Sequence, residues 1–152
     1  MCAPTVNSYK RSGAVSTRTG AAWSPRSVSY GGNDWSLYLR VPDGNRVELR
    51  AVDGSANPYL AAAAVLAAGL DGIGRGLDPG DPGEKSAGGR APLPPTLLHA
   101  VESLAADRVV RAALDAVGGG VSAYFAEVKR AEFFVWHGEV SAWETKRYLT
   151  AL

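Results

Sequence analysis

Alternating apolar and polar positions predict two neighbouring strands, over residues 35–41 and 46–52. The apolar positions are Trp35, Leu37, Leu39 and Val41 in the first segment and Val47, Leu49 and Ala51 in the second. Side chains alternate between the two faces of a strand, so each set shares one face. The turn residues at 42–45 join the segments into an antiparallel hairpin. A further strand is expected over residues 21–31, at an edge or a bulge because of Pro25.

The same alternation constrains the register of the hairpin. Val41 opposite Val47, or opposite Asn45, keeps the two apolar faces together. Val41 opposite Arg46 would turn one apolar set into water, because a shift of one residue reverses every side chain. In the favoured registers, the charged face carries Arg40, Arg46, Glu48 and Arg50. The opposite face, with Leu37, Leu39, Val47 and Leu49, is expected to pack against helices.

The second half of the chain is predicted to be helical. Asn57 is a good N-cap and Pro58 suits the first helical position, so a helix is expected over residues 57–73. Residues 74–95 hold six glycines and five prolines, which predicts an exposed loop. Three or four helices follow over residues 96–150, with a break at Gly118–Gly120. With a strand-rich segment over residues 1–53, the chain is predicted to be one α+β domain spanning 1–152, in which antiparallel strands are followed by a helical half.

Composition narrows the classes of function. The chain has 152 residues with 46% hydrophobic and 20% charged, enough for a packed core. Its formal charge of +1 gives no general attraction to nucleic acid or to a membrane surface. No signal-peptide pattern opens the chain, and Leu60–Ala68 is too short to span a bilayer, so the cytoplasm is the expected compartment. Cys2 is the single cysteine, which excludes an internal disulfide and a CxxC metal site.

The segment Arg46–Arg50 carries the strongest candidate chemistry. Same-face residues two apart on a strand lie about 6.5–7 Å apart, so two guanidinium groups flank the Glu48 carboxylate. Such a row can neutralise a polyphosphate while the carboxylate binds a hard cation. The alternative is a solvated sheet face, on which alternating charges maintain solubility, and the pattern alone favours this alternative.

Several segments, in consecutive order, resemble glutamine synthetase. They are Asn7–Arg11, Arg40–Pro42, Arg46–Arg50, Asp53 through Ala56–Leu60, and Ala67–Ile73. The end of the chain, with Val128–Glu132, Val140 to Glu144 and Tyr148–Leu149, is similar to the type III-like branch. The resemblance covers nearly the whole chain and implies the carboxyl-terminal part of the catalytic domain. The family reaction joins ammonia or an amine to the side-chain carboxylate of glutamate, with cleavage of ATP.

The resemblance also implies a role for each matched residue. Glu48 matches the strand glutamate that binds a catalytic Mg²⁺ or Mn²⁺ near the ATP phosphates. Arg50 matches the arginine that stabilises the transferred phosphoryl group and the acyl-phosphate intermediate. Arg40 and Arg46 match arginines that contact the nucleotide phosphates. Arg11 matches the arginine that binds the carboxylate of the amino-acid substrate.

Two departures from the family pattern stand out. Trp35 occupies the position where a phosphate-binding arginine is usual. Strand alternation places it on the apolar face with Leu37 and Leu39, whereas a local bulge would turn it toward the charged face to stack on an adenine or an arginine. No Asp or Glu lies between Arg11 and Gly32, where many members carry a glutamate that guards the intermediate.

The further metal-binding residues of the family lie upstream of the matched segments. Glu48 alone would bind a cation weakly, so the chain is expected to be inactive by itself and to need the upstream half or full-length ligase subunits. The alternative hypothesis is a non-catalytic, stand-alone module that binds a ligase or another protein through its apolar edge. His99 and His137 are interpreted as surface or packing residues. The tryptophans of the rest of the chain are interpreted as packing residues rather than as part of a cofactor site: Trp23, Trp136 and Trp143.

Overall fold

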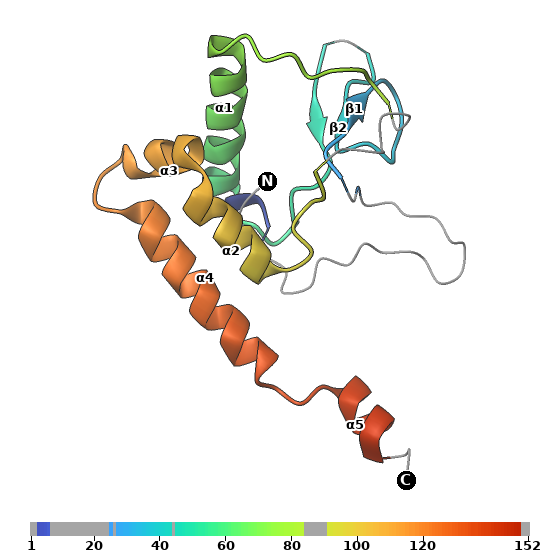
Figure 1. Cartoon of the computed structure of the whole chain (residues 1–152), viewed down its shortest axis with the longest axis vertical. Coiled ribbons are helices and arrows are strands. Elements are labelled where there is room, and N and C mark those ends of the chain that lie inside the picture. Colours follow the sequence, from blue (N-terminus) through green and yellow to red (C-terminus); the bar gives the residue numbers. More distant parts are fainter. Residues whose placement is uncertain (1–2, 7–24, 26, 44, 84–90, 150–152) are drawn as a thin grey trace.

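The computed structural model describes residues 3–6, 25, 27–43, 45–83 and 91–149, which form a small sheet beside a group of helices (Figure 1). The strands are β1 (Tyr30–Gly31), β2 (Leu39–Arg40) and β3 (Glu48–Leu49). The helices are the 3-10 helix η1 (Ala3–Thr5), α1 (Pro58–Gly74), α2 (Leu97–Ala106), α3 (Arg108–Asp115), α4 (Val121–His137) and α5 (Ala142–Leu149). The predicted α+β class is confirmed.

The sheet has the order β1-β2-β3. β2 and β3 pair antiparallel with Leu39 opposite Leu49 and Arg40 opposite Glu48, which is the register that sets Val41 against Val47. That prediction is confirmed. The expectation of purely antiparallel strands is wrong for β1, which pairs parallel to β2. Because each strand is only two residues long, residues 32–38 suffice to return the chain for a parallel pairing.

The first predicted strand, over residues 35–41, is interrupted by a turn. A single side-chain oxygen of Asp34 accepts hydrogen bonds from the backbone N–H and the hydroxyl of Ser36, both at 2.8 Å. Such an Asx turn competes with strand pairing for the same backbone groups. Regular pairing therefore starts only at Leu39, and the alternation predicted for Trp35 does not hold.

Helix α1 begins where the sequence predicts. The side-chain oxygen of Asn57 accepts hydrogen bonds from the backbone N–H groups of Tyr59 and Leu60, at 3.0 and 3.2 Å. Pro58 occupies the first helical position, where its missing N–H costs nothing. The helix ends at Gly74, and residues 75–83 form a loop as expected.

The hydrophobic core lies among the helices, around α2. Leu97, Val101 and Leu104 of α2 have no exposed surface and belong to one cluster with residues of α1, α3 and α4. The core is completed by Ala64, Val110, Leu114 and Phe133. Burial of one such large apolar side chain stabilises the fold by about 1.5–3 kcal/mol. The 3-10 helix η1 packs against both α1 and α2 and so ties the start of the chain to this core.

The apolar face of the hairpin is turned toward α1, as expected, but it is not closely packed. Leu37 is buried, whereas Leu39 and Leu49 are half-buried and Val47 is exposed. A cleft of about 440 Å³ lies between Leu39, Val47 and Leu49 on one side and α1 on the other. The apolar face is thus directed toward the helices as predicted, but it is not packed closely against them.

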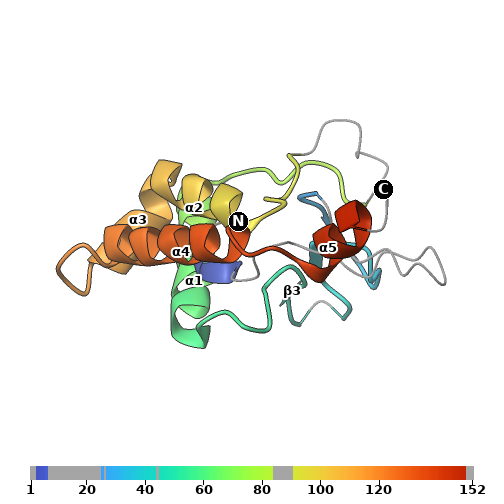
Figure 2. The same cartoon turned by 90° about the horizontal axis from the view of Figure 1, so that it is seen from below.

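Helix α4 packs against α2 and α3, and α5 lies beyond its end, outside the group of helices (Figures 1 and 2). Helix α5 lies at the far end of α4 and has no buried residue. In the described part of the chain, no helix is long and apolar enough to cross a membrane.

The carboxylate of Asp115 connects the end of α3 to the start of α4 through hydrogen bonds. Gly118–Gly120 adopt positive φ angles, and Gly120 offers no side chain to cap α4. Asp115, at the end of α3, accepts hydrogen bonds from the backbone N–H and the hydroxyl of Ser122, both at 2.8 Å. Asp115 thus caps α4 from seven residues upstream.

Asp115→Asn is expected to lower stability at neutral pH and to flatten its dependence on acid. The bond from the Ser122 backbone N–H holds the pKa of the Asp115 carboxyl below its usual value. Stabilisation by a group with a lowered pKa is present above the pKa of the unfolded chain and disappears as the pH falls through the folded pKa. Thermal unfolding followed by circular dichroism across this acid range measures the effect. Glu127→Gln, an exposed carboxylate on α4, is the control, and an equal loss in both variants would contradict the capping role.

Candidate functional site

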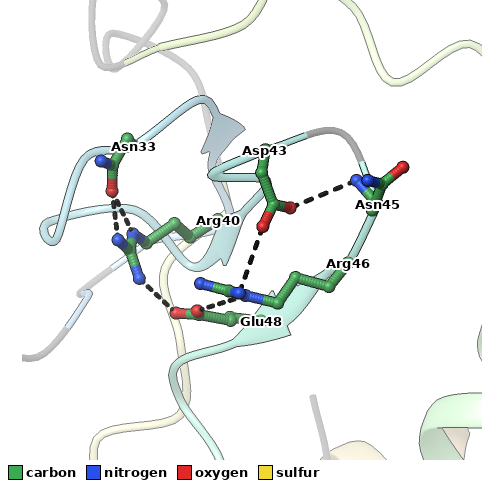
Figure 3. A network of polar contacts seen from close by, with 6 residues as sticks. All are labelled: Asn33, Arg40, Asp43, Asn45, Arg46 and Glu48. Atoms are coloured by element: carbon green, nitrogen blue, oxygen red, sulfur yellow. Dashed lines mark hydrogen bonds and ion pairs between the residues drawn. The ribbon is translucent and has the colours of Figure 1, made fainter.

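The charged face of the hairpin is organised by an ion pair between β2 and β3. The Arg40 Nη1 donates to Glu48 Oε2 at 2.6 Å (Figure 3). The Arg40 side chain is only 8% exposed, whereas that of Glu48 is 33% exposed. The pair exists because the register sets Arg40 directly opposite Glu48. Breaking a buried pair leaves an uncompensated charge, so this contact constrains the pairing of the two strands.

Asn33 binds the other edge of the Arg40 guanidinium group. Its side-chain oxygen accepts from Arg40 Nε at 2.9 Å and also from Nη2 (Figure 3). Asn33 precedes the Asp34 turn and therefore reaches back over β2. With Asn33 on one edge and Glu48 on the other, the orientation of the Arg40 guanidinium plane is fixed.

Arg46 completes the group from the exposed side. Its guanidinium lies 3.2 Å from Glu48 Oε1 and 3.1 Å from the Asp43 carboxylate, and its side chain is 59% exposed. Asp43 also accepts a hydrogen bond from the backbone N–H of Asn45, which orders the turn (Figure 3). Exposed ion pairs contribute only about 0–1 kcal/mol, so Arg46 can exchange its partners easily.

Trp35 lies on the charged face, which corrects the expectation that it packs with Leu37 and Leu39. Its ring centroid is 4.3 Å from Arg40 Cζ and 5.1 Å from Arg50 Cζ, and Trp35 is 55% exposed. The Asp34 turn is the physical reason, because it breaks the strand alternation just before Leu37. The alternative of a stack on an arginine is the arrangement observed.

The charges of the site perturb two carboxyl groups. The hydrogen bond from Arg40 is the largest cause that lowers the pKa of Glu48, and the bond from Arg46 adds to it against the opposing effect of burial. The backbone N–H of Ser36 is the largest cause that lowers the pKa of Asp34, to which the charge of Arg50 contributes less. Both groups are thus held as carboxylates.

The structure brings together four of the five residues assigned from the sequence. Arg40, Arg46 and Glu48 are in direct contact, and Arg50 joins them through the ring of Trp35. Arg11 lies outside the described residues. The roles of these five residues in binding and catalysis stay predictions.

The described residues alone do not fit a divalent metal ion. Both oxygens of Glu48 already accept hydrogen bonds from arginines, and no three His, Cys, Asp or Glu side chains of the described chain gather into a metal-binding group. A hard cation requires several oxygen ligands. Guanidinium groups, in contrast, suit phosphate oxygens, so this face fits a phosphate-bearing ligand better than a metal alone.

Three further residues of the site were not identified as such from the sequence: Asn33, Asp34 and Asp43. Asp43 lies in the predicted turn, three residues before Arg46, which is a spacing that could have indicated an ion pair. The Asn-Asp sequence before a predicted strand is a signal for a side-chain turn. No local pattern indicates that Asn33 reaches Arg40, because that contact depends on the path of the turn.

The histidines and tryptophans of the helical half behave largely as expected. His137 stacks on Phe133 with ring centroids 5.8 Å apart, and Trp136 packs on the same ring at 5.5 Å. His99 contacts the hydroxyl of Thr96 at the start of α2. Trp143 is exposed on α5, which corrects its interpretation as a packing residue; Trp23 lies outside the described residues.

Comparison with known proteins identifies the family. Residues 1–148 match the model of the glutamine synthetase catalytic domain, and the chain belongs to this family. The glutamate–methylamine ligase of Methyloversatilis universalis is 43% identical over 98% of this chain and 35% of its own length. The glutamine synthetase of Halobacterium salinarum is 42% identical over 96% of this chain and 33% of its own length.

A solved structure supports the fold. A GmaS/ADP complex covers 97% of this chain with a TM-score of 0.81 and 45% sequence identity, and 35% of that chain is matched. This chain therefore spans about a third of the length of the relatives that it matches. The described site accordingly lies within the third of the relatives' length that this chain matches.

We expect the pKa of Glu48 to depend more on Arg40 than on Arg46. Arg40 is buried and donates at 2.6 Å, whereas Arg46 is exposed and donates at 3.2 Å. In Arg40→Met the pKa of Glu48 should rise toward its usual value further than in the matched variant Arg46→Met. Titration of the Glu48 carboxyl carbon by NMR measures both shifts. An equal or larger rise in Arg46→Met would show that the arrangement of the ion pairs is different.

Proposed function

We propose that this chain forms the phosphate-facing part of the active site of an ATP-dependent ligase. The ligase would join ammonia or a small primary amine to the side-chain carboxylate of glutamate. The chain belongs to the glutamine synthetase catalytic-domain family, and its relatives include a glutamate–methylamine ligase and glutamine synthetases. We place the reaction in the cytoplasm.

The observation that carries this proposal is the convergence of three arginines on one sheet face. Arg40, Arg46 and Arg50 gather around Glu48 and Trp35, although they come from three different positions of the hairpin. On a merely solvated face the arginines would project into water, whereas the Arg40 side chain is only 8% exposed. Grouped guanidinium groups instead provide forked donors for the oxygens of a phosphate.

The proposed chemistry has two steps. The γ-phosphoryl group of ATP is transferred to the glutamate side chain, giving an acyl phosphate and ADP. The amine then attacks the acyl carbon, the amide bond forms, and phosphate leaves with release of a proton. Charge develops on phosphate oxygens in both steps, so fixed guanidinium groups lower the barrier by electrostatic stabilisation.

Within this scheme the arginines differ in mobility. Arg40 is fixed by Asn33 and Glu48, so it provides a constant positive charge beneath the site. Arg46 is exposed and is held by weak pairs, so it can turn to the nucleotide phosphates when they arrive. Arg50 is proposed to contact the transferred phosphoryl group, and Arg11 the carboxylate of the substrate. A Mg²⁺ or Mn²⁺ ion at Glu48 would need ligands from outside the described residues.

The alternative of a non-catalytic docking module is supported by helix α1. Its outer face exposes Tyr59, Leu66, Leu70 and Ile73, while Ala61 and Ala64 are buried on the other side. A helix that is apolar on all sides is normally covered on all sides. In a ligase, the other two thirds of the chain would cover this face; in a module, a separate partner protein would do so.

Size-exclusion chromatography of the purified chain discriminates between these two functions. We expect soluble aggregates, because the exposed apolar face of α1 favours non-specific association. In Leu66→Lys and Leu70→Lys variants the aggregates should decrease, and Glu127→Lys is the control on an exposed position outside this face. A discrete wild-type monomer or small oligomer would favour the module.

The purified chain is expected to show no glutamate-dependent ATP hydrolysis and no amide formation by itself. The described residues supply one candidate carboxylate for a metal site that needs several ligands. Coupled release of ADP and phosphate, with glutamate and either ammonia or methylamine, measures the activity. Glu48→Gln is the background control, and turnover clearly above it would contradict this expectation.

The same assay tests the proposed function when the part of the ligase that this chain does not cover is added as a separate protein. The chain is mixed with a form of the Methyloversatilis relative that lacks the matching third. Activity that appears with the wild-type chain and falls by at least about 100-fold with Arg50→Lys supports the proposal, because phosphoryl stabilisation by a positioned donor contributes about that much. Equal activity with both chains would refute the role of Arg50.

A further inference from the structure

Trp35 occupies an unusual place for a large aromatic side chain in this molecule. It is more than half exposed, yet its ring lies against two cations, 4.3 Å from Arg40 Cζ and 5.1 Å from Arg50 Cζ. The Asp34–Ser36 turn holds it there by two hydrogen bonds of 2.8 Å. The turn at Asp34–Ser36 therefore places the ring on the charged face and interrupts the regular strand there.

Successive contacts link Arg40, Trp35 and Arg50, and the Arg40 guanidinium is the fixed member of the three. Arg40 is buried, and Asn33 and Glu48 bind the two edges of its guanidinium group. Trp35 contacts the Arg40 guanidinium and, with the same ring, that of Arg50. Arg50 is thus linked to the fixed Arg40 through an aromatic ring.

A ring contact has a property that an ion pair lacks. A cation over an aromatic face is attracted by the ring quadrupole and uses none of its N–H donors for this contact. The donors of a guanidinium lie in its plane, where phosphate oxygens bind. A carboxylate at position 35 would occupy those donors, and an arginine there would repel both neighbours.

We propose that Trp35 is a positioning residue, which holds the guanidinium group of Arg50 beside that of Arg40 so that Arg50 presents its donors to a phosphate-bearing ligand. The ligand in this statement rests on the proposed function; the positioning of Arg50 by the ring does not. Trp35 takes no part in the reaction itself and acts through Arg50.

The first test measures the positioning without any ligand. The Nε–Hε resonances of the arginines are recorded by NMR in a chain that also carries Leu66→Lys and Leu70→Lys to suppress association, and they are assigned with Arg40→Met and Arg50→Met. Trp35→Leu should move the Arg40 and Arg50 resonances, because they lose the ring current of the indole. Trp35→Phe should move them less, and Trp143→Leu, at an exposed tryptophan on α5, should leave them in place. Unmoved resonances in Trp35→Leu would overturn the proposal.

The second test measures the consequence for an anion, with pyrophosphate as the probe in calorimetric titration. We expect the Kd of Trp35→Leu to rise about tenfold, which corresponds to about 1.4 kcal/mol. That of Trp35→Phe, which keeps an aromatic face, should rise by less than about threefold, since a cation–π contact contributes roughly 0.5–2 kcal/mol. An unchanged Kd in Trp35→Leu would overturn the effect on the ligand.

The two tests separate the inference from the proposed function. Resonance shifts without any binding of pyrophosphate to the wild-type chain would support positioning of Arg50 and refute a phosphate-facing site. Circular dichroism verifies that each variant is folded. If Trp35→Leu is unfolded, Trp35→Phe decides the question: a shift in the same direction supports the proposal, and none overturns it.

Discussion

The ion pair between Arg40 and Glu48 is the contact on which the candidate site depends. It lies across the hairpin at the centre of the sheet and fixes the pairing of two strands that are each only two residues long. Strands this short gain little from backbone bonds alone, so side-chain pairs across them contribute much of their stability. The same pair orients the guanidinium that Trp35 and Asn33 contact. Loss of Arg40 would thus affect the register, the turn and the charged face together.

Patterns that repeat along the chain were sufficient to predict the frame of the fold. Alternation predicted the register of the hairpin, because only one family of pairings keeps both apolar sets on the same face. Asn57 and Pro58 placed the start of α1 to the residue, because capping is decided by adjacent residues. The break at Gly118–Gly120 followed from the conformations that glycine allows.

The parts that escaped prediction depend on contacts that no local pattern encodes. Trp35 fits the alternation of a strand, but the Asp34 turn competes for the same backbone and turns the ring to the other face. The parallel pairing of β1 likewise depends on the path of that turn. Arg40 looked like one of four equivalent charges on an exposed face, whereas its burial results from three neighbours that converge only in the folded chain.

The charge balance of the face explains how it can accept an anion and still be stable without one. Three guanidinium groups, of Arg40, Arg46 and Arg50, are accompanied by the carboxylates of Asp34, Asp43 and Glu48. A phosphate must therefore compete with existing partners. It cannot displace Glu48 from Arg40 cheaply, because the buried Arg40 guanidinium would lose its carboxylate partner. It can take Arg46 from Asp43 at a cost of about 1 kcal/mol or less, because that pair is exposed. The buried pair thus gives the site its shape, and the exposed pairs make its charge available.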